Sequence, residues 1–325
     1  MEKEITKMKS STDSKDYINF HHEEIEKIFT TVGYMIDIKE TEKIKRLPRL
    51  TAIEDLENII KYTLYSDKSP TELSVNRNCV DISLILLYHF RSHESTELLL
   101  DYLKKDIQYL FNWQHTRSLE HILPIFTYCA TFHAKKFIAL STEANICYWN
   151  RIVIPLALNR ISAMYPELRH KSIELLKELM MKYYIKRNDA GVFDIRFVGS
   201  MIDDIVKTGT RELLSDIEYY FDEDLVDESY CGTIEKIREE IKKGGITHKM
   251  IPQKNITGTL ANYFIELFFS DNRYENEIET QCVIKNGTSK SRKSRRESVY
   301  EMFTKLLIFN VKNRKTSYKS AISTS

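Results

Sequence analysis

Glycine and proline are scarce in this sequence. Only 9 glycines and 6 prolines occur among 325 residues, which leaves little material for the tight turns of hairpins and barrels. Apolar residues make up 42% and charged residues 29% of the chain, a mixture typical of amphipathic helices with solvated outer faces. The composition therefore argues against a turn-rich β architecture and favours an all-α fold.

Paired cysteines and long apolar runs are also missing. The five cysteines are odd in number, widely spaced and never in a CxxC arrangement, so we expect reduced thiols rather than disulfides. The most apolar run, Ile82–Leu87, is far shorter than the ~18 residues of a membrane span. The first residues mix both charge signs and lack the apolar core of a secretory signal. We expect a soluble, cytoplasmic protein without membrane contact.

The motifs of common catalytic sites are absent as well. The sequence contains no GxSxG, no Walker loop and no GxGxxG, so we expect neither an enzyme nor a cofactor. His89 and His93 are four residues apart, as are Cys129 and His133, and this spacing is compatible with metal ligands on one helix face. Neither pair has further ligands at a suitable spacing, and histidines at helix ends also interact favourably with the helix dipole. We therefore expect no metal site.

The net charge of +1 conceals an uneven distribution. From Lys285 to the C-terminus there are 11 basic and 2 acidic residues, whereas the preceding part holds 37 basic and 45 acidic residues. The sequence thus predicts an acidic body with a basic tail.

Apolar periodicity divides the chain into five parts. We expect a disordered N-terminus at 1–14, a helical-repeat domain at 15–270, a polar to basic linker at 271–297, an amphipathic helix at 298–310 and a disordered tail at 311–325. The first helix is predicted from Lys15 to Val32. Capping-box patterns at Thr51 and Ser69 predict two further helix starts.

A repeated helix pair occupies the middle of the chain. Residues 81–113 predict a buried helix, a turn at 91–94 and an antiparallel helix capped by Ser95. A similar pattern returns about 42 residues later, with Phe132 in the place of Phe90. A period of ~40 residues is in the HEAT or armadillo range, so we predict an α-solenoid of antiparallel helix pairs. Pro155 is expected to kink or divide the helix at 145–162.

Asp194–Gly245 is the clearest of these units. It contains a helix, a Thr/Gly break, a second helix, an acidic elbow and a third helix that two glycines stop. The candidate partner-binding residues belong to the elbow: Asp222, Glu223, Asp224, Asp227 and Glu228. Together with Asp203 and Asp204 they could also suggest acid/base chemistry or cation binding, but no partner base or nucleophile accompanies them. The alternative is an exposed turn between stacked helices.

The basic tail is the second candidate surface. Its strongest cluster consists of Lys290, Arg292, Lys293, Arg295 and Arg296. Neutralising several phosphates with such a run gives salt-sensitive, sequence-independent binding of nucleic acid. A solvated tail, or a tail that folds back on the acidic body, explains the same composition.

Two segments resemble a known family. They are HILPIFTYCATFH at 121–133 and LLSDIEYYFDEDLVDES at 213–229, the latter followed by Gly232 and an acidic helix. This pattern resembles a bacterial HEAT-like family, the domain of unknown function 1186, over Asn76–Lys243. The resemblance implies an all-helical superhelix and no established activity. Some relatives end in a cysteine-rich zinc motif, which this chain lacks because only Cys282 follows Cys231.

These observations lead to a scaffold hypothesis. Stacked helix pairs provide a long, fixed surface of the kind that binds proteins or peptides, and the hypothesis rests on this analogy of fold. Binding of nucleic acid through the tail is the alternative, and a hydrolase that uses the acidic elbow is a third hypothesis.

Overall fold

The computed structural model describes residues 18–66, 68–113, 119–244 and 256–264. Within these ranges every regular element is helical and no residue is in a β-strand, so the predicted all-α class is confirmed. Internal contacts divide the chain into two units, Met1–Pro252 and Gln253–Ser325. None of the described helices is long and apolar enough to cross a bilayer.

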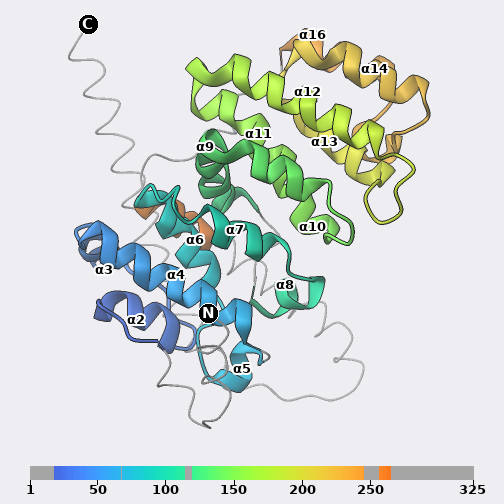
Figure 1. The fold of residues 1–325 in the computed structure, drawn as a ribbon. Helices are drawn as coiled ribbons and strands as arrows, with labels where there is room; N and C mark the ends of the chain where they lie inside the picture. Colours follow the sequence, from blue (N-terminus) through green and yellow to red (C-terminus); the bar gives the residue numbers. More distant parts are fainter. Residues whose placement is uncertain (1–17, 67, 114–118, 245–255, 265–325) are drawn as a thin grey trace, which may run out of the picture. The chain divides into compact units, whose positions relative to one another are not determined.

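Figure 1 shows the helices of the first unit. The N-terminal helices are α2 (Glu23–Thr30), α3 (Ile38–Ile44), α4 (Arg49–Tyr65), α5 (Pro70–Leu73), α6 (Cys79–His89), α7 (Thr96–Leu103) and α8 (Ile107–Trp113). They are followed by η2 (Leu119–His121), α9 (Leu123–Ser141), α10 (Tyr148–Arg151), α11 (Val153–Met164), η3 (Pro166–Leu168) and α12 (Arg169–Ile185). The last are α13 (Ile195–Thr208), η4 (Arg211–Leu213), α14 (Leu214–Asp222), α15 (Glu228–Cys231) and α16 (Ile234–Lys243). In the second unit, 256–264 is helical.

Several predicted helix ends are confirmed. The Ser69 hydroxyl accepts from the Glu72 N–H and the Glu72 carboxylate accepts from the Ser69 N–H, so the predicted capping box starts α5. Gly209 and Gly244 end α13 and α16 with φ of 66° and 90°, a left-handed conformation that glycine adopts without strain.

The predicted start of the first helix is wrong. Among the described residues this helix begins only at Glu23. The reason is a contact with α4, because the backbone N–H groups of His21 and His22 each donate to the Asp55 carboxylate at 2.9 Å. These bonds hold the segment before Glu23 outside the helix.

The predicted cap of α4 is also wrong. The helix begins at Arg49, directly after Pro48. Thr51 therefore lies inside the first turn, and its hydroxyl donates to the Pro48 carbonyl at 3.2 Å. Proline at the preceding position has a fixed φ that suits a helix start. The capping-box pattern at Thr51 therefore predicted a start three residues too late.

The second predicted turn, near Phe132, is a kink rather than a turn. α9 continues through this point, and only His133 leaves helical geometry, with φ −127° and ψ 29°. The surrounding residues are compatible with a helix and include no glycine or proline. By contrast, α6 does end before Arg91, whose φ of 54° breaks the helix.

Pro155 divides its helix as predicted. α10 and α11 are separated at Ile152, and Pro155 lies in the first turn of α11. At that position its missing N–H costs no intrahelical hydrogen bond.

The core of the first unit runs along successive neighbouring helices. α4 packs on α6 and α7, α9 packs on α6, α7 and α11, and α11 also packs on α12 and α13. α13 in turn packs on α15 and α16. The largest fully buried side chains include Trp113, Tyr102, Tyr183 and Phe126.

Polar contacts between helices recur at a nearly constant sequence separation. Asn150 donates to the Lys105 carbonyl across 45 residues, and Lys186 donates to the Thr142 carbonyl across 44. Tyr220 donates to the Met180 carbonyl across 40 residues, and Arg169 donates to Glu212 across 43. These four contacts join segments that lie 40 to 45 residues apart in the sequence.

Candidate interaction surface

The acidic elbow connects α14 to α15. Asp222 is the last residue of α14 and Glu223 caps its C-terminus, while Asp227 caps α15 and Glu228 is its first residue. Asp224 has a φ of 57°, a left-handed conformation that aspartate tolerates better than most residues. This residue turns the chain between the two helices.

The five elbow carboxylates form no ion pairs in the part of the chain that the structure describes. Within the described ranges, none of them forms an ion pair with a lysine, arginine or histidine, whereas carboxylates just before the elbow do. Glu212 pairs with Arg169 at 2.9 Å and Glu218 pairs with Arg238 at 2.7 Å. The elbow is therefore a local concentration of negative charge without direct ion pairs, although Arg238 lies near enough to Asp222 to interact electrostatically with it.

Asp227 differs from the other four elbow residues because its groups are used in the fold. Its Oδ1 atom accepts from the N–H and the hydroxyl of Ser229 at 3.0 and 2.6 Å. Its own N–H donates to the Ile195 carbonyl at 3.2 Å. Asp227 thus joins α15 to the start of α13, which leaves Asp222, Glu223, Asp224 and Glu228 as the exposed carboxylates.

Gly199 makes this contact of α13 with α15 possible. A Cβ atom at this position would lie 2.7 Å from the Asp227 carbonyl oxygen and 3.0 Å from the Tyr230 Cβ. The two backbones therefore approach more closely than any other side chain allows. Sequence reasoning missed Gly199, although a glycine inside a strongly amphipathic helix is a signal of close packing.

Two exposed tyrosines flank the elbow. Tyr219 on α14 is 45% exposed and Tyr230 on α15 is 43% exposed. Tyr219 is held in place because its hydroxyl donates to the Tyr184 hydroxyl at 2.6 Å. Trp113, by contrast, is buried.

Asp203 and Asp204 do not form a carboxylate pair. Asp203 pairs with Lys207 at the surface, whereas Asp204 is buried and accepts from the Asn159 amide at 2.7 Å. Burial raises the pKa of Asp204 to about 6, against the opposing effect of the Asn159 hydrogen bond. Asp204 is thus enclosed between α11 and α13, away from the surface ion pair of Asp203.

The histidine and cysteine side chains pack against other groups, and the His93 and His133 ring centroids lie 5.9 Å apart. The Cys129 thiol donates to the Ser92 carbonyl at 3.4 Å, and the His93 ring stacks on Phe132. Burial lowers the pKa of His89. No group of three potential metal ligands exists among the described side chains.

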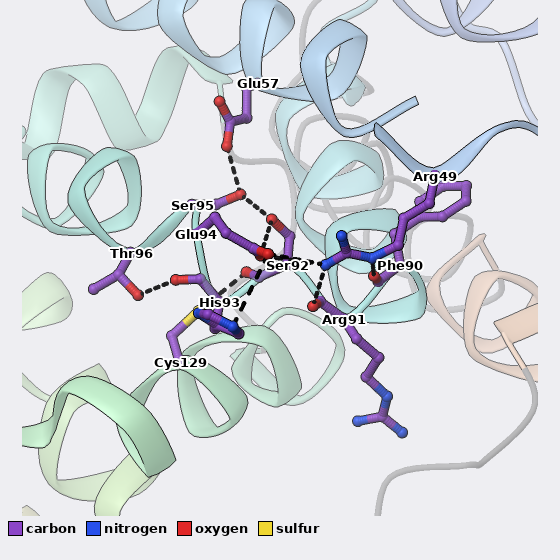
Figure 2. A network of polar contacts seen from close by, with 10 residues as sticks. All are labelled: Arg49, Glu57, Phe90, Arg91, Ser92, His93, Glu94, Ser95, Thr96 and Cys129. Carbon is purple, nitrogen blue, oxygen red and sulfur yellow. Dashed lines mark hydrogen bonds and ion pairs between the residues drawn. The ribbon is translucent and has the colours of Figure 1, made fainter. Parts of the chain in front are cut away.

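Figure 2 shows the polar network around the loop after α6. Arg49 donates to the Phe90 and Arg91 carbonyls at 2.8 and 2.9 Å and pairs with Glu94. The Ser95 hydroxyl donates to Glu57 at 2.7 Å, so Ser95 contacts α4 instead of capping α7 with its side chain. The network satisfies the carbonyls at the end of α6 and fixes the loop.

Three of the described thiols, those of Cys79, Cys129 and Cys231, are not activated as nucleophiles. Burial raises the pKa of Cys129 to about 12 and that of Cys231 to about 11. Burial also raises the pKa of Cys79. Since the thiolate is the reactive form, these three side chains are protonated and unreactive near neutral pH.

A groove of about 760 Å³ lies at the C-terminal ends of α9 and α12. Its walls include Lys182 and Lys186 as well as Glu143 and Asp189. Lys182 pairs with Glu178 at 3.3 Å and Lys186 donates to a carbonyl. The groove has charges of both signs, and its two lysines already contact other protein groups. Its lining therefore does not indicate a particular class of ligand.

The predicted nucleic-acid-binding residues, Lys290, Arg292, Lys293, Arg295 and Arg296, lie outside the described residues, as does the predicted helix at 298–310. Comparison of the chain with protein-family models, curated proteins and solved structures finds no match. The function is therefore inferred from the chemistry of the described surface.

Proposed function

We propose that this protein is a helical-repeat scaffold that binds a basic segment of a partner protein at its acidic elbow. The recurrence of interhelical contacts every 40 to 45 residues supports a solenoid of stacked helix pairs. The resemblance to the HEAT-like domain of unknown function 1186 has the same implication. Repeats of this kind present an extended, fixed binding surface.

One observation supports the acidic elbow as the binding surface. Asp222, Glu223, Asp224 and Glu228 are exposed and form no ion pair in the described part of the chain, and Tyr219 and Tyr230 flank them. Unpaired carboxylates steer a basic partner toward the surface. Tyrosines supply large contact area and attract cations through their ring faces. Lysine- or arginine-rich segments combine both requirements.

Binding of a defined basic peptide tests this function. The probe is a fluorescein-labelled peptide of alternating lysine and alanine, and its glutamate–alanine counterpart is the negative control. We expect the full chain to bind the lysine peptide at low salt. The double variant Glu223→Lys, Glu228→Lys should weaken this binding about tenfold, which corresponds to about 1.4 kcal/mol, as measured by fluorescence anisotropy.

The matched control changes the net charge by the same amount at another place. Glu23→Lys, Glu26→Lys alters two exposed carboxylates of α2 and should leave the affinity within about twofold. Equal losses in both double variants would mean that the peptide responds only to bulk charge. That result, or no binding by the unaltered chain, would contradict the proposal.

A further inference from the structure

A cationic aromatic surface lies at the end of α6 and the kink of α9. We call it the arginine shelf, and it consists of Tyr88, Arg91, His93, Tyr128 and Phe132. The Arg91 guanidinium lies 4.4 Å from the Tyr88 ring centroid and 5.3 Å from that of Tyr128. It also donates to the Tyr165 hydroxyl at 3.2 Å, so the charge is held in a fixed position.

Phe132 provides an exposed apolar group on the same shelf. Its side chain is 54% exposed although it is large and apolar. The ring is oriented by His93, which stacks on it at 4.5 Å, and by Tyr128 at 5.3 Å. Because Tyr128 contacts both Arg91 and Phe132, the cation and the exposed ring belong to one surface.

Arg91 is a strained residue with unused hydrogen-bonding capacity. Its φ of 54° is unfavourable for an arginine, and a glycine or asparagine would make the same turn with less strain. In the described part of the chain Arg91 has no ion pair with a carboxylate, since the nearby Glu94 pairs with Arg49. A guanidinium has five N–H donors, so several remain for an incoming carboxylate.

A second cation lies close to the shelf. The Lys171 ammonium donates to the Thr131 carbonyl at 2.9 Å, beside the kink, and no carboxylate pairs with it within the described ranges. Lys171 belongs to α12, whereas the two lysines on this part of α9 are neutralised, because Lys135 pairs with Glu178 and Lys136 pairs with Glu97. The shelf therefore presents the charges of Arg91 and Lys171 together with an exposed ring, while Glu94 lies 3.9 Å from the His93 Nε2 atom at its edge.

We propose that the arginine shelf of one chain binds the acidic elbow of a second copy. The two surfaces are complementary in charge, and each also exposes aromatic rings, which are enriched at the energetic centres of interfaces. The shelf lies on α6 and α9 and the elbow on α14 and α15, so the contact is heterologous and each added copy leaves one shelf and one elbow free. This inference rests on the elbow being a docking surface, as the proposed function holds.

Sedimentation velocity of the full chain tests the inference. We expect the weight-average sedimentation coefficient to rise between about 10 and about 300 µM protein at low salt. The association constant should fall about tenfold in about 500 mM NaCl because the contact is electrostatic. The shelf variant Arg91→Glu, Phe132→Ser and the elbow variant Glu223→Lys, Glu228→Lys should each remain monomeric. Circular dichroism confirms that each is folded.

Mixing the two variants gives the decisive measurement. The shelf variant retains an intact elbow and the elbow variant retains an intact shelf, so their equimolar mixture should associate although neither variant does so alone. Leu50→Ser, which changes an apolar residue 75% exposed elsewhere on the surface, should associate like the unaltered chain. A mixture that stays monomeric, or a shelf variant that associates like the unaltered chain, would overturn the inference.

The two proposals fail separately. An unaltered chain that is monomeric at every concentration but binds the lysine peptide through its elbow overturns self-association and leaves the proposed function intact. If the unaltered chain self-associates, the elbow variant does not, and the chain fails to bind the lysine peptide, self-association through the elbow stands and the binding of a basic partner segment is overturned.

Discussion

Asp203 and Asp204 are neighbours in sequence with opposite environments. Successive residues of a helix point about 100° apart, so one side chain reaches solvent while the other enters the core between α11 and α13. There Asp204 meets Asn159, whose amide donates to both its carboxylate and its carbonyl oxygen. A pair of acidic residues in sequence thus supplies one surface ion pair and one buried acid.

Asp204 should make stability depend on pH. Burial raises its pKa from 3.8 to about 6 in the folded chain, so the folded state binds the proton more tightly than the unfolded state. The contribution of this group to the free energy of unfolding is therefore greatest below about pH 4, falls as the pH rises, and is lost above about pH 6. A shift of this size corresponds to about 3 kcal/mol.

The variant Asp204→Asn checks this dependence. Asparagine retains an oxygen that can accept from Asn159 but does not titrate. In urea unfolding across this pH range, Asp204→Asn should lose less stability than the unaltered chain as the pH rises. Asp203→Asn, on the exposed side of the same helix, should leave the pH dependence of the buried acid unchanged. Identical pH dependence in the unaltered chain and both variants would contradict this assignment.

At the scale of elements, the elbow is positioned by the contact of α13 with α15. Only a hydrogen fits between Gly199 and the Asp227 carbonyl, since a Cβ would lie 2.7 Å from that oxygen. The Asp227 N–H bonds to the Ile195 carbonyl in the same contact. The short helix α15 has too few residues to be stable alone, so this contact holds its part of the elbow.

Gly199→Ala should therefore destabilise the protein although alanine favours helices. The helix propensity of alanine contributes up to about 1 kcal/mol, whereas forcing the two backbones apart costs about 1–3 kcal/mol. We expect a net loss in the free energy of unfolding, measured by urea denaturation, and weaker binding of the lysine peptide. Lys207→Ala, at an exposed position of the same helix, should change stability by less than about 0.5 kcal/mol. A more stable Gly199→Ala variant would show that α15 does not pack this closely.

For the whole molecule, the uneven distribution of charge is the basis of the alternative function, the binding of nucleic acid. The segment from Lys285 onward carries the excess of basic residues, so nucleic acid is expected to bind there rather than along the acidic body. Binding of a labelled single-stranded oligonucleotide should fall steeply between about 50 and about 200 mM salt. Replacing Lys290, Arg292 and Arg295 with glutamine should reduce the logarithmic salt slope by about 0.7 for each phosphate that the tail no longer neutralises.

The elbow variant Glu223→Lys, Glu228→Lys serves as the control for this measurement. It removes negative charge from the body and should leave the salt slope of the tail unchanged. Absence of binding at low salt, or binding that does not respond to the tail substitutions, would eliminate nucleic acid as the ligand of the basic cluster.

Local sequence was sufficient to predict the helical class, the stops at Gly209 and Gly244 and the capping box at Ser69. Helical periodicity and caps depend on residues within a few positions of one another, so they can be read without knowledge of the rest of the chain. The place of the acidic elbow between two helices was predictable for the same reason.

Tertiary structure decided the features that depend on contacts between distant residues. His21 and His22 leave the first helix because Asp55 accepts from their N–H groups, and Arg91 is fixed by Tyr128 on α9 and by Tyr165 between α11 and η3. Gly199 meets Asp227 across the contact between α13 and α15. A periodic pattern specifies which face of a helix is apolar, but the packing partner of each residue is set only when the helices meet.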